Sequence, residues 1–124
     1  MIYRDLDALQ SLKPKAEWTW IGYEYSGLDW LDSNQTKPTE SEINAEITRL
    51  NNAEPMRLLR VERDARLTAC DWIITMHKEL GTNIPAAWKT YRQSLRDLPA
   101  SASPSLDSNG DLDLTSVTWP TEPS

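Results

Sequence analysis

Phenylalanine is absent from this sequence of 124 residues, cysteine and histidine occur once each, and there are only four glycines. A lone Cys70 cannot form an internal disulfide, which suits a reducing cytosol. The glycines stand isolated from one another, so no glycine-rich loop is available to cradle a phosphate. Both observations argue against a disulfide-stabilised secreted domain and against a nucleotide-driven mechanism.

Long apolar runs and excess basic charge are also missing. No apolar run approaches the ~18 residues that a membrane-spanning helix needs, so we expect no membrane partner. The net charge is −6, which predicts no broad basic face and therefore no nucleic-acid partner.

The sequence contains few of the side chains that usually carry catalysis. Cys70 and His77 lie two helical turns apart, about 10 Å along a helix axis, which is too far for direct proton transfer. With one cysteine and one histidine, the chain cannot form a standard zinc site without several carboxylates. We therefore expect structural roles for both residues, no cofactor and no metal. The hypothesis that the chain is a small enzyme would need a metal or a polar cleft. Metal analysis and a search for such a cleft would test it.

Tryptophan and acidic residues are distributed unevenly. There are six tryptophans and four tyrosines, residue types that are favoured where a surface meets a partner. Residues 99–124 are rich in Ser and Pro and carry four acidic and no basic side chains. Such a segment cannot fold alone. It is either mobile or docked through a few apolar anchors.

The N-terminal half predicts a small mixed module. Residues 4–13 have the spacing of a short helix, and strands over residues 16–25 and 28–31 favour a β-hairpin. Thr39 and Glu42 then form a capping box, the mark of a helix start. We expect that helix to end near Asn51-Asn52.

Two further helices are predicted. The first runs from about Ala53 to Leu80 and stops at Gly81. The second begins at Pro85 and stops at Pro99. Their short link predicts an antiparallel helical hairpin. The apolar stripe of the first helix consists of Leu58, Val61, Ala65, Ala69, Trp72, Met76 and Leu80. The stripe of the second consists of Ile84, Trp88, Tyr91, Leu95 and Leu98.

The predicted fold class is therefore α+β. A small N-terminal β-hairpin with helices (residues 1–52) is followed by a long antiparallel helical hairpin (53–98). An extended, acidic, Pro/Ser-rich C-terminal tail (99–124) completes the chain.

Three motifs in the second half appear in a recognisable order. Asp71-Trp72 is followed by Trp-x-x-Tyr-Arg-Gln-x-Leu-Arg-Asp-Leu-Pro over residues 88–99, and then by Val-x-Trp-Pro-x-x-Pro over residues 117–123. This set closely resembles the phage tail assembly chaperone family, small proteins associated with tail fibres, over residues 56–123. The N-terminal half is similar to a module found beside tail-fibre and other phage tail-associated proteins. That similarity is carried by Ala8-Leu9, Leu12, Pro14, Trp18, Leu28-Asp29-Trp30, Pro38-Thr39 and Glu42-Ile43.

The resemblance implies a phage origin and an assembly role. It suggests a non-catalytic chaperone that binds and shields a tail-fibre or other tail protein in the host cytoplasm. The alternative is a structural component retained on the tail fibre or baseplate of the virion, and a homo-oligomer stays open.

Eight residues are candidates for partner binding. The alternative for each apolar candidate is a place in the intramolecular core. The alternative for each arginine is a local contact within its own chain. Trp119 either folds back on the chain's own helices or docks on another subunit. The candidates are Trp72, Trp88, Tyr91, Arg92, Leu95, Arg96, Trp119 and Pro120.

Overall fold

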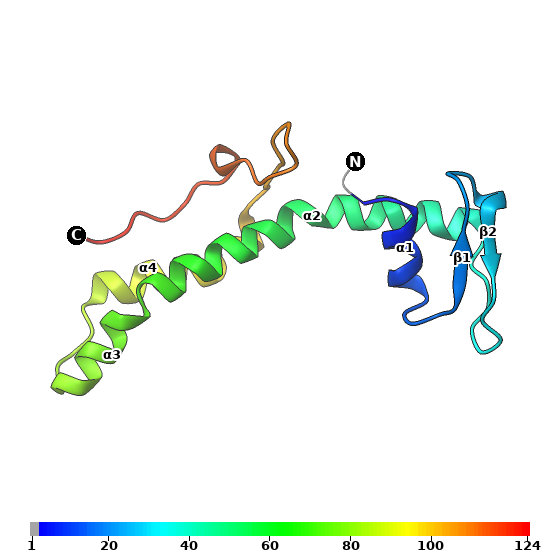
Figure 1. The fold of residues 1–124 in the computed structure, drawn as a ribbon. Helices are drawn as coiled ribbons and strands as arrows, with labels where there is room; N and C mark the ends of the chain where they lie inside the picture. The colour runs from blue at the N-terminus through cyan, green and yellow to red at the C-terminus, as the bar shows by residue number, and fades with distance from the viewer. Residues whose placement is uncertain (1–2) are drawn as a thin grey trace. The chain divides into compact units, whose positions relative to one another are not determined.

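The computed structural model describes residues 3–124 and has the α+β architecture that the sequence predicts (Figure 1). Residues 1 and 2 of the predicted N-terminal module lie outside the described residues. The elements are α1 (Asp5–Leu12), β1 (Trp18–Trp20), β2 (Leu28–Trp30), α2 (Glu40–Ala69), α3 (Asp71–Leu80) and α4 (Ala86–Ser101), with short 3-10 turns at Tyr25–Gly27 and Leu114–Ser116. Within the described residues, no helix has both the length and the apolar character needed to cross a membrane.

Contacts divide the chain into two compact units, Met1–Ala53 and Glu54–Ser124. Helix α2 contributes its first part to one unit and its second part to the other. The tail, residues 99–124, belongs to the second unit, together with α3 and α4.

The predicted β-hairpin is confirmed, although its strands are shorter than expected. Trp18 pairs with Trp30 and Trp20 with Leu28 in an antiparallel register. Gly27 closes the turn, and its carbonyl accepts from the Ile21 amide at 3.0 Å. A Cβ at residue 27 would lie 1.8 Å from the Ile21 carbonyl oxygen, so only glycine fits there.

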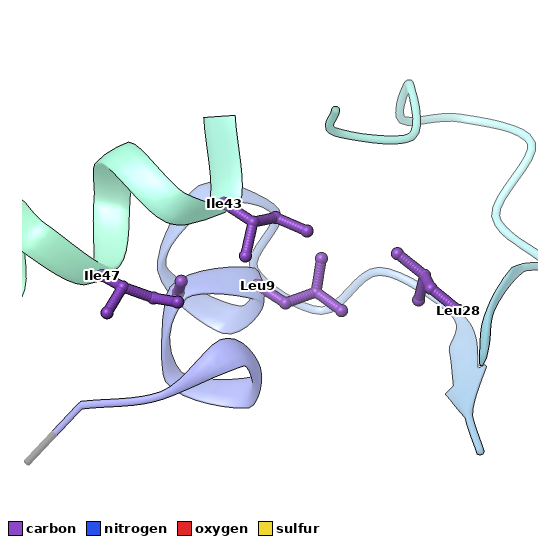
Figure 2. Packing of buried hydrophobic residues seen from close by; sticks show 5 residues of the cluster. Leu9, Leu28, Ile43 and Ile47 are labelled. Atoms are coloured by element: carbon purple, nitrogen blue, oxygen red, sulfur yellow. The ribbon is translucent and has the colours of Figure 1, made fainter. Parts of the chain in front are cut away.

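The core of the first unit joins the hairpin to both helices. Figure 2 shows Leu9 of α1 among Leu28 of β2 and Ile43 and Ile47 of α2. Leu9 is fully buried. A two-stranded hairpin is marginal by itself, and this cluster supplies the third surface that it needs.

The capping box at the start of α2 is confirmed. The Glu42 amide donates to Thr39 Oγ1 at 3.1 Å, and the Thr39 amide donates to Glu42 Oε1 at 3.3 Å. The expected end of this helix at Asn51-Asn52 is wrong, because α2 continues to Ala69. The Asn51 side chain accepts from the Tyr3 amide at 3.0 Å and donates to the Tyr3 carbonyl at 3.2 Å. It therefore holds the N-terminal segment and does not cap the helix.

Helix α2 also runs through Pro55, which has no amide to donate to the Asn51 carbonyl. The prediction of one helix from Ala53 to Leu80 is wrong as well. The helix breaks at Cys70, whose backbone (φ −111°, ψ 8°) leaves the helical region, and α3 begins at Asp71. Gly81 ends α3 in a left-handed conformation, as predicted.

Helix α4 begins one residue after Pro85 and continues through Pro99 to Ser101, so Pro99 does not stop it. A proline within a helix removes one hydrogen bond. Packing compensates here, because Leu98 beside it is buried against Leu59 of α2 and Val117 of the tail. The last turn of α4 is therefore held by tertiary contacts.

The tail is docked, which settles the two alternatives left open by its composition. Leu106 and Leu112 form an antiparallel bridge, and the Asp107 side chain between them accepts from the Asn109 and Asp111 amides. Further on, Val117 is buried against α2 and α4.

Candidate functional site

The inward face of α4 is core. Leu95 is fully buried and Tyr91 nearly so, and both cluster with Cys70 and Ile73. Trp88 is half-buried and meets Tyr91 edge-on, with ring centroids 5.8 Å apart. Burial raises the pKa of Tyr91, and the nearby charge of Glu122 adds to the rise. In the chain by itself, these three candidate residues stabilise the fold.

Arg92 holds the junction where α2 gives way to α3. Its Nη1 donates to the Leu67 carbonyl at 3.0 Å and to Cys70 Sγ at 2.9 Å, and its Nη2 donates to Asp71 Oδ1 at 2.8 Å. The end of a helix leaves carbonyls without partners, and the Arg92 fork satisfies one of them. Burial lowers the pKa of Arg92, but the hydrogen bonds to Cys70 and Asp71 outweigh burial and raise it.

Cys70 and His77 belong to separate hydrogen-bond sets. The buried Cys70 thiol lies 3.3 Å from the Leu67 carbonyl, whereas His77 Nδ1 lies 2.7 Å from Thr82 Oγ1. Across residues 3–124, no three His, Cys, Asp or Glu side chains gather in a way that could hold a metal ion.

Trp119 folds back on its own chain. The Arg66 guanidinium lies over its ring, 4.1 Å from the centroid, and its indole N–H donates to the Leu114 carbonyl at 3.2 Å. The ring packs against both apolar clusters of the second unit. Pro120 follows in a shallow pocket shared with Ser94 and Leu98.

Trp72 differs from the other apolar candidates because it is 61% exposed. It stands on α3, four residues before the half-buried Met76 and eight before Leu80, which is 67% exposed. Residues four apart lie on one face of a helix, so these three side chains form an apolar stripe. We call Trp72, Met76 and Leu80 the α3 stripe.

The predicted apolar stripe of residues 58–80 therefore has the wrong phase. Val61, Trp72 and Leu80 face solvent, whereas Leu59, Cys70 and Ile73 are buried. Both sets have helical spacing, and only the partner surface decides which one is covered. Trp72 was predicted as a candidate for partner binding, whereas Met76 and Leu80 were predicted only as members of the apolar stripe.

Arg96 remains at the surface, where its guanidinium donates to Gln93 Oε1 at 3.0 Å. It lines a groove together with Lys89, which the sequence analysis did not single out. The signal was available, because Lys89 and Arg96 are seven residues apart and so share a helix face.

A family model described as phage tail assembly chaperone protein matches residues 56–124, which lie within the second unit. No curated protein and no solved structure matches the chain.

Proposed function

This chain belongs to the phage tail assembly chaperone protein family, and we propose that within this role it binds and shields a tail-fibre protein before that protein is assembled. The observation that carries the proposal is the α3 stripe. Two of its three side chains are more than half exposed, whereas most of the other apolar side chains of α3 and α4 pack into the two clusters of this unit. An exposed apolar stripe of this kind marks a protein–protein contact.

The chemistry of the stripe suits an unassembled fibre chain. Strands that have not yet found their neighbours expose apolar side chains and open edges, which aggregate. Covering one tryptophan and one leucine contributes ~2–4 kcal/mol before ordering costs are subtracted. Contact energy of that size is reversible, so the closing fibre displaces the chaperone by competing for the same surface.

We further propose that the chain acts without catalysis, in the host cytoplasm where tails are assembled. The absence of catalysis is supported by the hydrogen bonds of Cys70 and Arg92, which serve the junction between α2 and α3. Purified virions test the location, because a structural component of the fibre or baseplate would be found in them and a departing chaperone would not.

Co-expression with the phage tail-fibre protein tests the proposal. Trp72→Ala combined with Leu80→Ala should lower the soluble fraction of the fibre protein severalfold and leave the helix content of the chaperone unchanged, because both side chains are exposed. Tyr23→Ala is the matched control, since Tyr23 is 97% exposed in the other unit. Full solubilisation by the double variant would overturn the proposal.

A further inference from the structure

A groove of about 450 Å³ is lined by residues of α3 and α4. Its lining contains three cationic side chains and no carboxylate. The lining residues are Ile74, Lys89, Thr90, Arg92, Gln93 and Arg96.

The charges of this groove are incompletely neutralised. Arg92 pairs with Asp71, whose carboxylate oxygen lies 2.8 Å from its Nη2. In residues 3–124, no carboxylate forms an ion pair with Lys89 or Arg96, and Arg96 contacts only the uncharged Gln93 amide. The groove therefore offers two cations that are available to a ligand.

The acidic tail of the same chain lies on another flank of α4. Trp119 and Pro120 share their pocket with Ser94, Asp97 and Ser101. Successive residues of a helix are turned by 100°, which places Ser94, Asp97 and Ser101 on one side of the buried face and Lys89, Arg92 and Arg96 on the other. The tail segment that docks on α4 thus leaves the basic groove open.

We propose that this groove binds an acidic segment of the tail protein, a stretch that carries Asp or Glu side chains. The inference rests on the proposed function for the existence of that client and adds the chemistry by which the client is recognised. Lys89 and Arg96 lie about 10 Å apart along α4, so they meet two carboxylates of one segment. Ile74 and the aliphatic stems of the cations contact its apolar parts.

In this proposal the α3 stripe and the basic groove contribute differently to client binding. The α3 stripe supplies apolar contact area, while the groove selects which segment is held. Residues 54–98 carry eight basic and six acidic side chains, whereas the chain as a whole has a net charge of −6. The excess of positive charge is thus local, which favours a short acidic peptide over a long polyanion such as nucleic acid.

Fluorescence anisotropy with the full chain tests the proposal. The probe is a labelled peptide that alternates glutamate with serine, and the reference is the same peptide with glutamine at each glutamate position. The glutamate peptide should bind and the glutamine peptide should not. Lys89→Gln combined with Arg96→Gln should weaken binding about tenfold. Raising the salt concentration to about 1 M should abolish it.

Arg60→Gln is the matched control for Arg96→Gln, because Arg60 is an exposed guanidinium of α2 that does not line the groove. Equal losses in these two variants would overturn the proposal, since binding would then follow net charge alone. Tighter binding of a single-stranded oligonucleotide than of the glutamate peptide would also overturn it. A third outcome would overturn it as well: a dimer of the unmodified chain in sedimentation experiments that is absent in the double variant. The groove would then be occupied by a second copy of this chain.

The two proposals fail separately. The peptide assay contains no fibre protein, so it reports on the groove even if the client is a different tail protein. Trp72→Ala combined with Leu80→Ala should retain peptide binding while losing the solubilising effect. Lys89→Gln combined with Arg96→Gln should lose peptide binding with the α3 stripe intact.

Discussion

The two units differ in one tryptophan. In Met1–Ala53, the Trp20 and Trp30 rings pack against the core and donate their indole N–H groups to the Glu24 and Gln35 carbonyls. In Glu54–Ser124, Trp119 is covered by Arg66 while Trp72 faces solvent. An indole whose polar edge and apolar body are both satisfied is structural. The difference shows that a tryptophan-rich composition indicates interaction only at the position where the ring is uncovered.

The two units also differ in how their apolar cores are arranged. The first unit has one apolar cluster drawn from both helices and β2. The second has two smaller clusters strung along its helices, each completed by the tail. A divided core leaves more helix surface uncovered, and the α3 stripe lies on that surface.

Cavity-forming substitutions give the largest expected effect and test whether the units are separate. Leu9→Ala and Leu95→Ala each remove a fully buried side chain from one core and should cost about 2–5 kcal/mol of unfolding free energy. Hydrogen exchange should show faster amide exchange in Met1–Ala53 for the first variant and in Glu54–Ser124 for the second. Uniform loss of protection across both units in either variant would contradict this division.

The contrast between packed and exposed tryptophans can be measured directly. Trp88→Ala should cost about 2 kcal/mol, because the half-buried ring packs on Tyr91 and the core. Trp72→Ala should stay within about 0.5 kcal/mol, as exposed sites usually do. Urea denaturation of both variants measures the difference. Equal losses would mean that Trp72 is part of the core and would remove the basis of the α3 stripe.

Arg92 tests whether the helix junction depends on a planar guanidinium. Arg92→Ala should cost about 1.5–3 kcal/mol, because the Leu67 carbonyl and Asp71 lose a charged donor. Arg92→Lys should recover only part of this, since an ammonium cannot donate in two directions from one plane. Thermal unfolding of the two variants gives the comparison, and complete recovery by lysine would refute the geometric argument.

The last prediction concerns the acid stability of the first unit. The hydrogen bonds from Arg49 and Ser11 lower the pKa of Glu46 to about 2, from a model-peptide value of 4.5. A carboxylate with a lowered pKa stabilises the fold above pH 4.5, and this contribution disappears as the pH falls toward 2. Glu46→Gln should therefore reduce stability at pH 7 and flatten the loss between pH 4.5 and 2. Parallel pH profiles of unfolding free energy for the two proteins would contradict the assignment.

Local signals in the sequence predicted local features well. The capping box at Thr39 and the end of α3 at Gly81 are both determined by residues close to them in the chain. Helix ends decided by distant partners were missed. Asn51 continues α2 because its side chain serves Tyr3, and Pro99 stays helical because Leu98 is anchored by Leu59 and Val117.

The candidate surface was predicted in part, for a related reason. Trp72 and Arg96, two of the partner-binding candidates, are exposed, whereas the candidates Tyr91 and Leu95 form core contacts. Partner binding by any of them stays a prediction. The predicted stripe is already out of phase within α2, where Leu59 is buried and Val61 is exposed. Which of two apolar faces is buried is a property of the pair of helices, and one helix alone does not specify it.

The buried sulfur of Cys70 beside Arg92 can report on how often the helix junction opens. Because Cys70 is the sole thiol of the sequence and is 2% exposed, an alkylating reagent reaches it only when the place where three helices meet comes apart. The rate of modification therefore times that opening. A client that binds the closed helix junction would slow the alkylation of Cys70. A client that binds the open junction would accelerate it.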